Sequence, residues 1–181
     1  MRSAAMRYLL LILMLLTVSA CQLAPLKGEQ APAYLAVPVG SELILTQDIT
    51  IPANQTSVYV QNGKVTTYSG RDQYYPNCKF ELYPISDKPR PVKADSFHIT
   101  RVQRDTDYAS TATPMYAGPV NSSDGGPLAI IYTVTFSLQS RLQPDVFRMS
   151  CEYWADPVSG EDLTLGEVRQ TLKPLFVLNV K

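Results

Sequence analysis

IIYTVTFSLQ, residues 130–139, is the stretch that decides the fold class of this chain, because apolar and polar residues alternate along it. The apolar residues of one parity are Ile130, Tyr132, Val134, Phe136 and Leu138. Successive side chains of a β-strand point to opposite faces, so the pattern predicts a strand with one packed and one solvated face. Residues 147–153 repeat the alternation after a short turn that contains Pro144, and they predict its hairpin partner. The side chains expected to face inward in that partner are those of Phe147, Met149, Cys151 and Tyr153.

Further strands are predicted on both sides of this pair. Residues 43–51, 78–82, 97–104 and 176–180 are rich in apolar, β-branched or aromatic side chains, and Gln47 interrupts the alternation of the first.

Two short signals mark a turn and a helix. Asn62-Gly63 separates residues 57–61 from 64–68, and this pair suits the positive φ angles of a type I′ hairpin turn. Thr164 and Glu167 have the spacing of a capping box, and Pro174 would end the short helix that follows.

These elements predict a single, mainly β domain. The expected fold is one antiparallel β-sandwich or small β-barrel with one short C-terminal helix, and a mixed α+β sheet is the alternative. At 181 residues the chain has the length of one domain and is long enough to bury a core.

The first residues have the three-part plan of a secretory signal. Arg2 and Arg7 give a positive start, and residues 8–18 form an apolar run that ends at Ser19 and Ala20. The run is short for a membrane-spanning helix, which needs about 20 apolar residues.

Val18-Ser19-Ala20-Cys21 resembles the lipobox of bacterial lipoprotein precursors. The resemblance covers residues 1–21. It implies that Cys21 becomes the first mature residue and carries the acyl chains that anchor the protein. It implies nothing about the fold of the residues that follow. Stable anchoring needs two or more chains, as such a cysteine carries. In Gram-negative members of this family an Asp after the cysteine favours the inner membrane, so Gln22 implies the outer membrane. Ordinary signal cleavage before Cys21 is the alternative, and it would leave an unpaired thiol.

The expected organisation therefore has three parts. Residues 1–20 are the lipoprotein signal peptide, residues 21–39 are the lipidated cysteine and a flexible spacer, and residues 40–181 are the β-rich domain. Three prolines and no sustained periodicity in residues 22–38 favour the spacer.

Charge argues against nucleic acid as a partner. The chain has 16 basic and 16 acidic residues, and removal of Arg2 and Arg7 with the signal leaves a net charge of −2. Nucleic-acid binders concentrate Lys and Arg on one face.

Cys78 and Cys151 are expected to form a disulfide. With Cys21 acylated they are the two remaining thiols, both on inward parities of predicted strands, in a compartment where disulfides persist. Two buried free thiols are the alternative, since sequence alone does not bring their Cα atoms together.

The sequence contains no recognisable catalytic constellation. His98 is the one imidazole, expected on the exposed face of its strand, and no G-x-S-x-G motif accompanies it. Asp105, Asp107 and the pair Glu161-Asp162 do not follow the EF-hand order for calcium. We expect a non-enzymatic protein without a metal or cofactor.

Tyrosines supply the candidate binding residues. Residues 105–127 form the longest stretch without a strand or helix pattern, and Tyr108 and Tyr116 within it are possible partner-binding residues. Tyr68, Tyr74 and Tyr75 are a second candidate surface, although core or strand-edge positions are the preferred interpretation for them.

Three functions remain open. The first is a non-enzymatic interaction or assembly module of the outer membrane, facing the periplasm, with an envelope protein as partner. The second is a β-barrel carrier of a small apolar or sugar-like ligand, which would need an interior cavity of several hundred cubic ångströms. The third is a hydrolase with acidic groups converging in a cleft.

Overall fold

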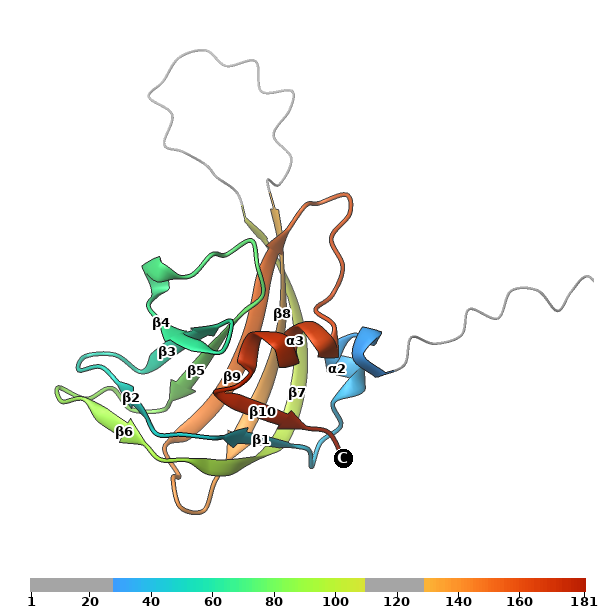
Figure 1. The fold of residues 1–181 in the computed structure, drawn as a ribbon. Helices are drawn as coiled ribbons and strands as arrows, with labels where there is room; N and C mark the ends of the chain where they lie inside the picture. Colours follow the sequence, from blue (N-terminus) through green and yellow to red (C-terminus); the bar gives the residue numbers. More distant parts are fainter. Residues whose placement is uncertain (1–27, 110–128) are drawn as a thin grey trace, which may run out of the picture.

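A computed structural model describes residues 28–109 and 129–181 of the chain. Eight antiparallel strands form one curled sheet, in the order β10-β1-β7-β8-β9-β5-β3-β4, and β2 and β6 form a small second sheet. The curled sheet is a half-barrel (Figure 1). The strands are β1 (Glu42–Leu45), β2 (Ile49–Ile51), β3 (Ser57–Gln61), β4 (Lys64–Thr66), β5 (Asn77–Leu82), β6 (Arg90–Val92), β7 (Asp95–Ala109), β8 (Ala129–Gln139), β9 (Val146–Ala155) and β10 (Phe176–Asn179). The helical elements are η2 (Gly28–Gln30), α2 (Ala33–Ala36), η3 (Tyr68–Gly70) and α3 (Leu165–Leu172). The predicted mainly antiparallel β fold with a short C-terminal helix is confirmed.

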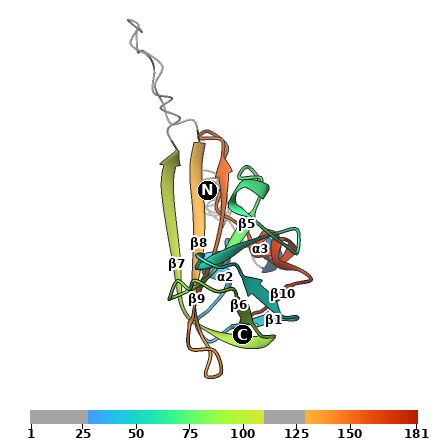
Figure 2. The same cartoon turned by 90° about the vertical axis from the view of Figure 1, so that its left-hand side faces the viewer.

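Helix α3 lies against the inner side of the half-barrel. Figure 2 shows β7 and β8 on one side of the molecule and α3 on the other. Its buried residues are Leu165, Val168, Thr171 and Leu172. The Thr164–Glu167 capping box is present, since the Thr164 hydroxyl accepts a hydrogen bond from the Glu167 amide and the Glu167 carboxylate accepts one from the Thr164 amide. The N–H of Gly63, in the β3–β4 turn, donates to the Thr171 carbonyl at 2.8 Å, which joins this end of the sheet to the helix.

The interior is packed with aliphatic side chains and four phenylalanines. Phe80, Phe97, Phe136 and Phe176 are fully buried. The ring centroids of Phe80 and Phe97 are 5.7 Å apart, and those of Phe80 and Phe176 are 5.4 Å apart.

The predicted hairpin at Asn62-Gly63 is confirmed. Asn62 and Gly63 have φ angles of 52° and 70°, and Gln61 pairs with Lys64 across the turn. The final strand is confirmed as β10.

Residues 28–38 correct the predicted spacer. Ala33 and Val37 are buried, the Ala33 amide donates to the Leu163 carbonyl at 2.8 Å, and the Leu165 amide donates to the Ala31 carbonyl at 2.9 Å. Residues 31–37 are therefore part of the packed domain, which does not start near Gly40. A single helical turn with two small apolar residues leaves almost no periodic signal in the sequence.

Two strand boundaries also differ from the prediction. Residues 43–51 form two strands in different sheets, and the break at residues 46–48 contains Gln47, where the alternation failed. Strand β7 runs to Ala109, where it pairs with Ala129, so the predicted patternless stretch 105–127 starts later than expected. Its remaining residues lie outside the described part of the chain.

Phe147 does not face inward as predicted. The register between β5 and β9 shifts so that Val146 opposes Leu82, and Val146 takes the buried position. Phe147 instead packs on the exposed Tyr83, with ring centroids 4.2 Å apart. An irregularity of this kind moves a side chain to the other face without any change in the local sequence pattern.

Candidate functional site

The predicted Cys78–Cys151 disulfide is present and joins neighbouring strands. The two sulfur atoms are 2.08 Å apart, and the residues face each other in the β5–β9 register with Cα atoms 3.9 Å apart. Both side chains are buried on the inner face of the sheet. The bond therefore links two neighbouring strands of the same sheet and does not cross the core.

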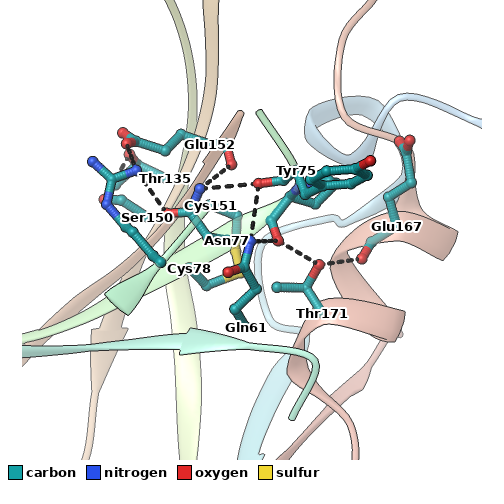
Figure 3. The surroundings of a disulfide bond; sticks show 12 residues. Gln61, Tyr75, Asn77, Cys78, Thr135, Ser150, Cys151, Glu152, Glu167 and Thr171 are labelled. Atoms are coloured by element: carbon teal, nitrogen blue, oxygen red, sulfur yellow. Dashed lines mark hydrogen bonds and ion pairs between the residues drawn. A yellow bond between two sulfur atoms is a disulfide. The ribbon is translucent and has the colours of Figure 1, made fainter. Parts of the chain in front are cut away.

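A buried polar network lies next to this disulfide (Figure 3). The side-chain amide of Asn77, which is fully buried, donates to the carbonyls of Tyr75 and Glu152, each at 3.1 Å. Arg71 Nη1 donates to Asn77 Oδ1 at 3.2 Å and lies 3.1 Å from Glu152 Oε1. The Arg71 side chain is 5% exposed, so its charge is buried, and the half-buried Glu152 carboxylate balances it.

This network positions residues 68–76, which we call the tyrosine loop. The Gln61 side chain binds the backbone of Asp72 twice, donating to its carbonyl at 2.8 Å and accepting from its amide at 2.9 Å. The Trp154 amide donates to the Gln73 carbonyl at 2.8 Å. The Thr171 hydroxyl of α3, which donates to the Glu167 carbonyl at 2.8 Å, lies 3.4 Å from the Pro76 carbonyl. Contacts from β3, β9 and α3 thus fix the loop along most of its length.

Tyr68, Tyr74 and Tyr75 are exposed on this loop. Their exposed fractions are 67%, 60% and 65%, so the preferred core or strand-edge interpretation is wrong for all three. The rings of Tyr74 and half-buried Trp154 meet edge to face, with centroids 6.1 Å apart. Aromatic side chains exposed on a rigid segment are typical of a binding surface, because little side-chain and backbone entropy remains to be lost on association.

A groove opens beside the tyrosine loop. It has a volume of about 690 Å³ and lies between residues 50–56 and residues 65–69, with Tyr59 and Lys79 of the sheet also lining it. Arg71 lies between two of its rings, with Cζ 5.0 Å from the Tyr59 centroid and 4.8 Å from that of Tyr68.

Tyr108 lies apart from this surface. It is 68% exposed and pairs with Ile130 near the end of the β7–β8 hairpin. Trp154 pairs with Ile131, the residue after Ile130 in β8. Because neighbouring residues of a strand point to opposite faces, Trp154 and Tyr108 lie on opposite faces of the sheet. The structure therefore does not bring Tyr108 to the tyrosine loop. Tyr116, its predicted companion, and Cys21, the predicted lipidation site, lie outside the described residues.

The titratable groups are distributed over the surface of the sheet. His98 is on the exposed face of β7, as predicted, with Nδ1 3.5 Å from Glu42 Oε1. Arg104 binds the carboxylate of Asp162 at 2.6 Å. Burial raises the pKa of Glu81, but hydrogen bonds from Arg148 and Lys79 outweigh it and hold that pKa below its ordinary value. Within residues 28–109 and 129–181, no three His, Cys, Asp or Glu side chains gather as metal ligands would.

Sequence reasoning missed the residues that support the loop. Gln61, Arg71 and Asn77 have no motif spacing. Gln61 gains its role from the loop backbone at Asp72, and Arg71 and Asn77 gain theirs from Glu152 of β9. The one available signal was the concentration of tyrosines in residues 68–75.

No family model, no curated protein and no solved structure matches this chain. In the described part of the chain, no helix combines the length and the apolar content that a membrane span requires.

Proposed function

We propose that the protein is an envelope lipoprotein, anchored to the outer membrane through acyl chains on Cys21, whose β-domain binds another envelope protein without catalysing a reaction. The observation that carries the proposal is the rigidly held tyrosine loop, which exposes Tyr74 beside Trp154 and Tyr75 beside α3. Interface centres are enriched in Tyr and Trp, and a fixed loop loses little entropy on binding.

The filled interior supports an interaction module over a carrier. Phe80, Phe97 and Phe176 pack on one another where a carrier would hold its ligand. The lipobox-like residues Val18-Ser19-Ala20-Cys21 support the anchor.

The anchor is tested by substitution of the cysteine. We expect Cys21→Ser to abolish labelling with a fatty-acid analogue and to release the protein from the membrane fraction, because the acyl chains provide the attachment. Labelling that persists in Cys21→Ser would reject acylation at this residue.

The binding surface is tested by crosslinking in the intact envelope. A photoreactive amino acid at position 74 or 75 is expected to give one discrete adduct with a protein. Position 142, in the turn between β8 and β9, is the control, since Leu142 is 82% exposed and distant in the sheet from the tyrosine loop. The same adduct from all three positions, or adducts from position 142 alone, would contradict the assignment of the surface.

A further inference from the structure

We propose that the groove beside the tyrosine loop is a binding site for a neutral glycan. This site is distinct from the Tyr74–Trp154 surface assigned above to a protein partner. Its volume of about 690 Å³ falls in the range of small-ligand sites. A site of that size accommodates several sugar rings side by side along the groove.

Two tyrosine rings give the groove its aromatic surface. The Tyr59 and Tyr68 centroids are 5.9 Å apart with the rings inclined at 67°, and Tyr68 remains 67% exposed. The face of an aromatic ring carries partial negative charge, and the C–H bonds on one side of a pyranose carry partial positive charge. A sugar ring therefore packs face to face on an exposed tyrosine.

Arg71 holds these rings in place from within the protein. Its guanidinium lies within 5.0 Å of both ring centroids and is itself bound to Glu152 and Asn77. The rings are thus oriented before any ligand arrives, which lowers the entropic cost of binding.

The remaining lining side chains suit a polyhydroxylated ligand. Ten of the fifteen lining residues carry a hydroxyl or an amide, and Lys79 is the one charged residue among them. Its ammonium lies 2.7 Å from Glu81 Oε1, so its charge is already paired. The side chains of Asn54, Gln55 and Thr56 make no hydrogen bond to another described residue, and they keep their donors and acceptors for a ligand.

Neutral lining distinguishes a glycan from the main alternatives. An anionic polymer would need unpaired Lys or Arg, as phosphate and carboxylate sites do. An extended peptide would gain most of its affinity from main-chain pairing along a strand edge and from apolar side-chain pockets. Hydroxyl and amide side chains around aromatic rings match a chain of uncharged sugars better than either.

The test is titration of the full chain, purified in a mild detergent, with defined hexasaccharides. Chitohexaose, cellohexaose and maltohexaose are the neutral probes, and hexagalacturonate is the anionic one. We expect heat release with at least one neutral probe and none with hexagalacturonate. Tyr68→Ala should lower that affinity about tenfold, the effect of losing one aromatic contact.

Tyr74→Ala is the matched control, because it removes an equally exposed tyrosine from the same loop but outside the groove. It should leave the glycan affinity unchanged while removing the protein adduct expected from the Tyr74 surface, so the two proposals fail independently.

Thr56→Val replaces a groove hydroxyl by a methyl group of similar size and should weaken glycan binding without affecting folding. The proposal is overturned if no neutral probe binds, if Tyr68→Ala binds as well as the parent, or if hexagalacturonate or an extended peptide competes for the groove in preference to the sugars.

Discussion

Glu81 links the stability of the domain to pH. It lies on the outer face of β5, where Lys79 and Arg148 hydrogen-bond to its carboxylate. Its pKa is lower in the folded chain than the ordinary value of 4.5, so the ionised form favours folding. This contribution is complete above the unfolded pKa and is lost as the pH falls through the lower, folded pKa.

We therefore expect stability to fall below about pH 5, and Glu81→Gln to flatten that decline. The variant should also be about 1 kcal/mol less stable at pH 7, because two cations lose their partner. Urea unfolding at pH 7, 5, 4 and 3 measures both effects. Asp87→Asn, which alters an exposed carboxylate in the loop between β5 and β6, is the control and should retain the decline. If the stability of Glu81→Gln declines with falling pH as much as that of the parent, Glu81 does not cause the decline.

Gly63 is required at its position for two separate reasons. Its φ of 70° favours glycine, and a Cβ there would lie 2.0 Å from the Lys173 carbonyl oxygen. We expect Gly63→Ala to destabilise the domain by about 2 kcal/mol or more. Gly28→Ala is the matched control, because Gly28 has a φ of 68° but nothing within 4 Å of its added Cβ. Denaturant midpoints should therefore shift more for position 63, and equal shifts would mean that steric contact with the helix end is unimportant.

At the level of secondary structure, the disulfide stabilises one strand pair. It closes a sequence separation of 73 residues between β5 and β9, which corresponds to about 4 kcal/mol in the loop-entropy account. The double substitution Cys78→Ala with Cys151→Ala should lower the free energy of unfolding by a few kcal/mol and preserve the far-ultraviolet circular dichroism. The unfolding midpoint of the parent under reducing conditions provides the comparison. If both cysteines of the unreduced, unfolded parent react with an alkylating reagent, the bond is absent.

Local pattern was sufficient to predict most elements but not their irregularities. The strand at residues 130–139, the Asn62-Gly63 hairpin and the Thr164 capping box depend on neighbours in sequence, and all three are confirmed. The inward parity of Cys78 and Cys151 likewise followed from alternation.

What could not be predicted depends on distant partners. The displacement of Phe147 comes from a register shift against β5, and the packing of Ala33 comes from its contact with the residues before α3. In the candidate site, too, some features could be predicted from the sequence and others depend on distant partners. Exposed tyrosines could be suspected from composition, whereas Arg71 gained its role only when β9 supplied Glu152. Such side chains have no spacing that a single sequence reveals.

For the whole molecule, the early start of the packed structure limits the distance between domain and membrane. If Cys21 is acylated, the chain from Cys21 to Gly28 reaches at most about 25 Å even when fully extended. Gly28 would then stay within that distance of the membrane surface.

The last prediction concerns the segment that joins the anchor to the sheet. A chain beginning at Gly40 should be less stable than one beginning at Gly28 by about 3 kcal/mol or more. The chain from Gly40 loses the buried Ala33 and Val37. It also loses two backbone hydrogen bonds, from the Ala33 amide to the Leu163 carbonyl and from the Leu165 amide to the Ala31 carbonyl, which contribute roughly 1 kcal/mol each. Urea unfolding compares the two truncated chains, and amide exchange in α3 locates the loss, since the helix start is the surface left uncovered. Equal midpoints and equal protection of α3 would show that residues 28–39 contribute nothing to the fold, and the spacer would then extend to Gly40.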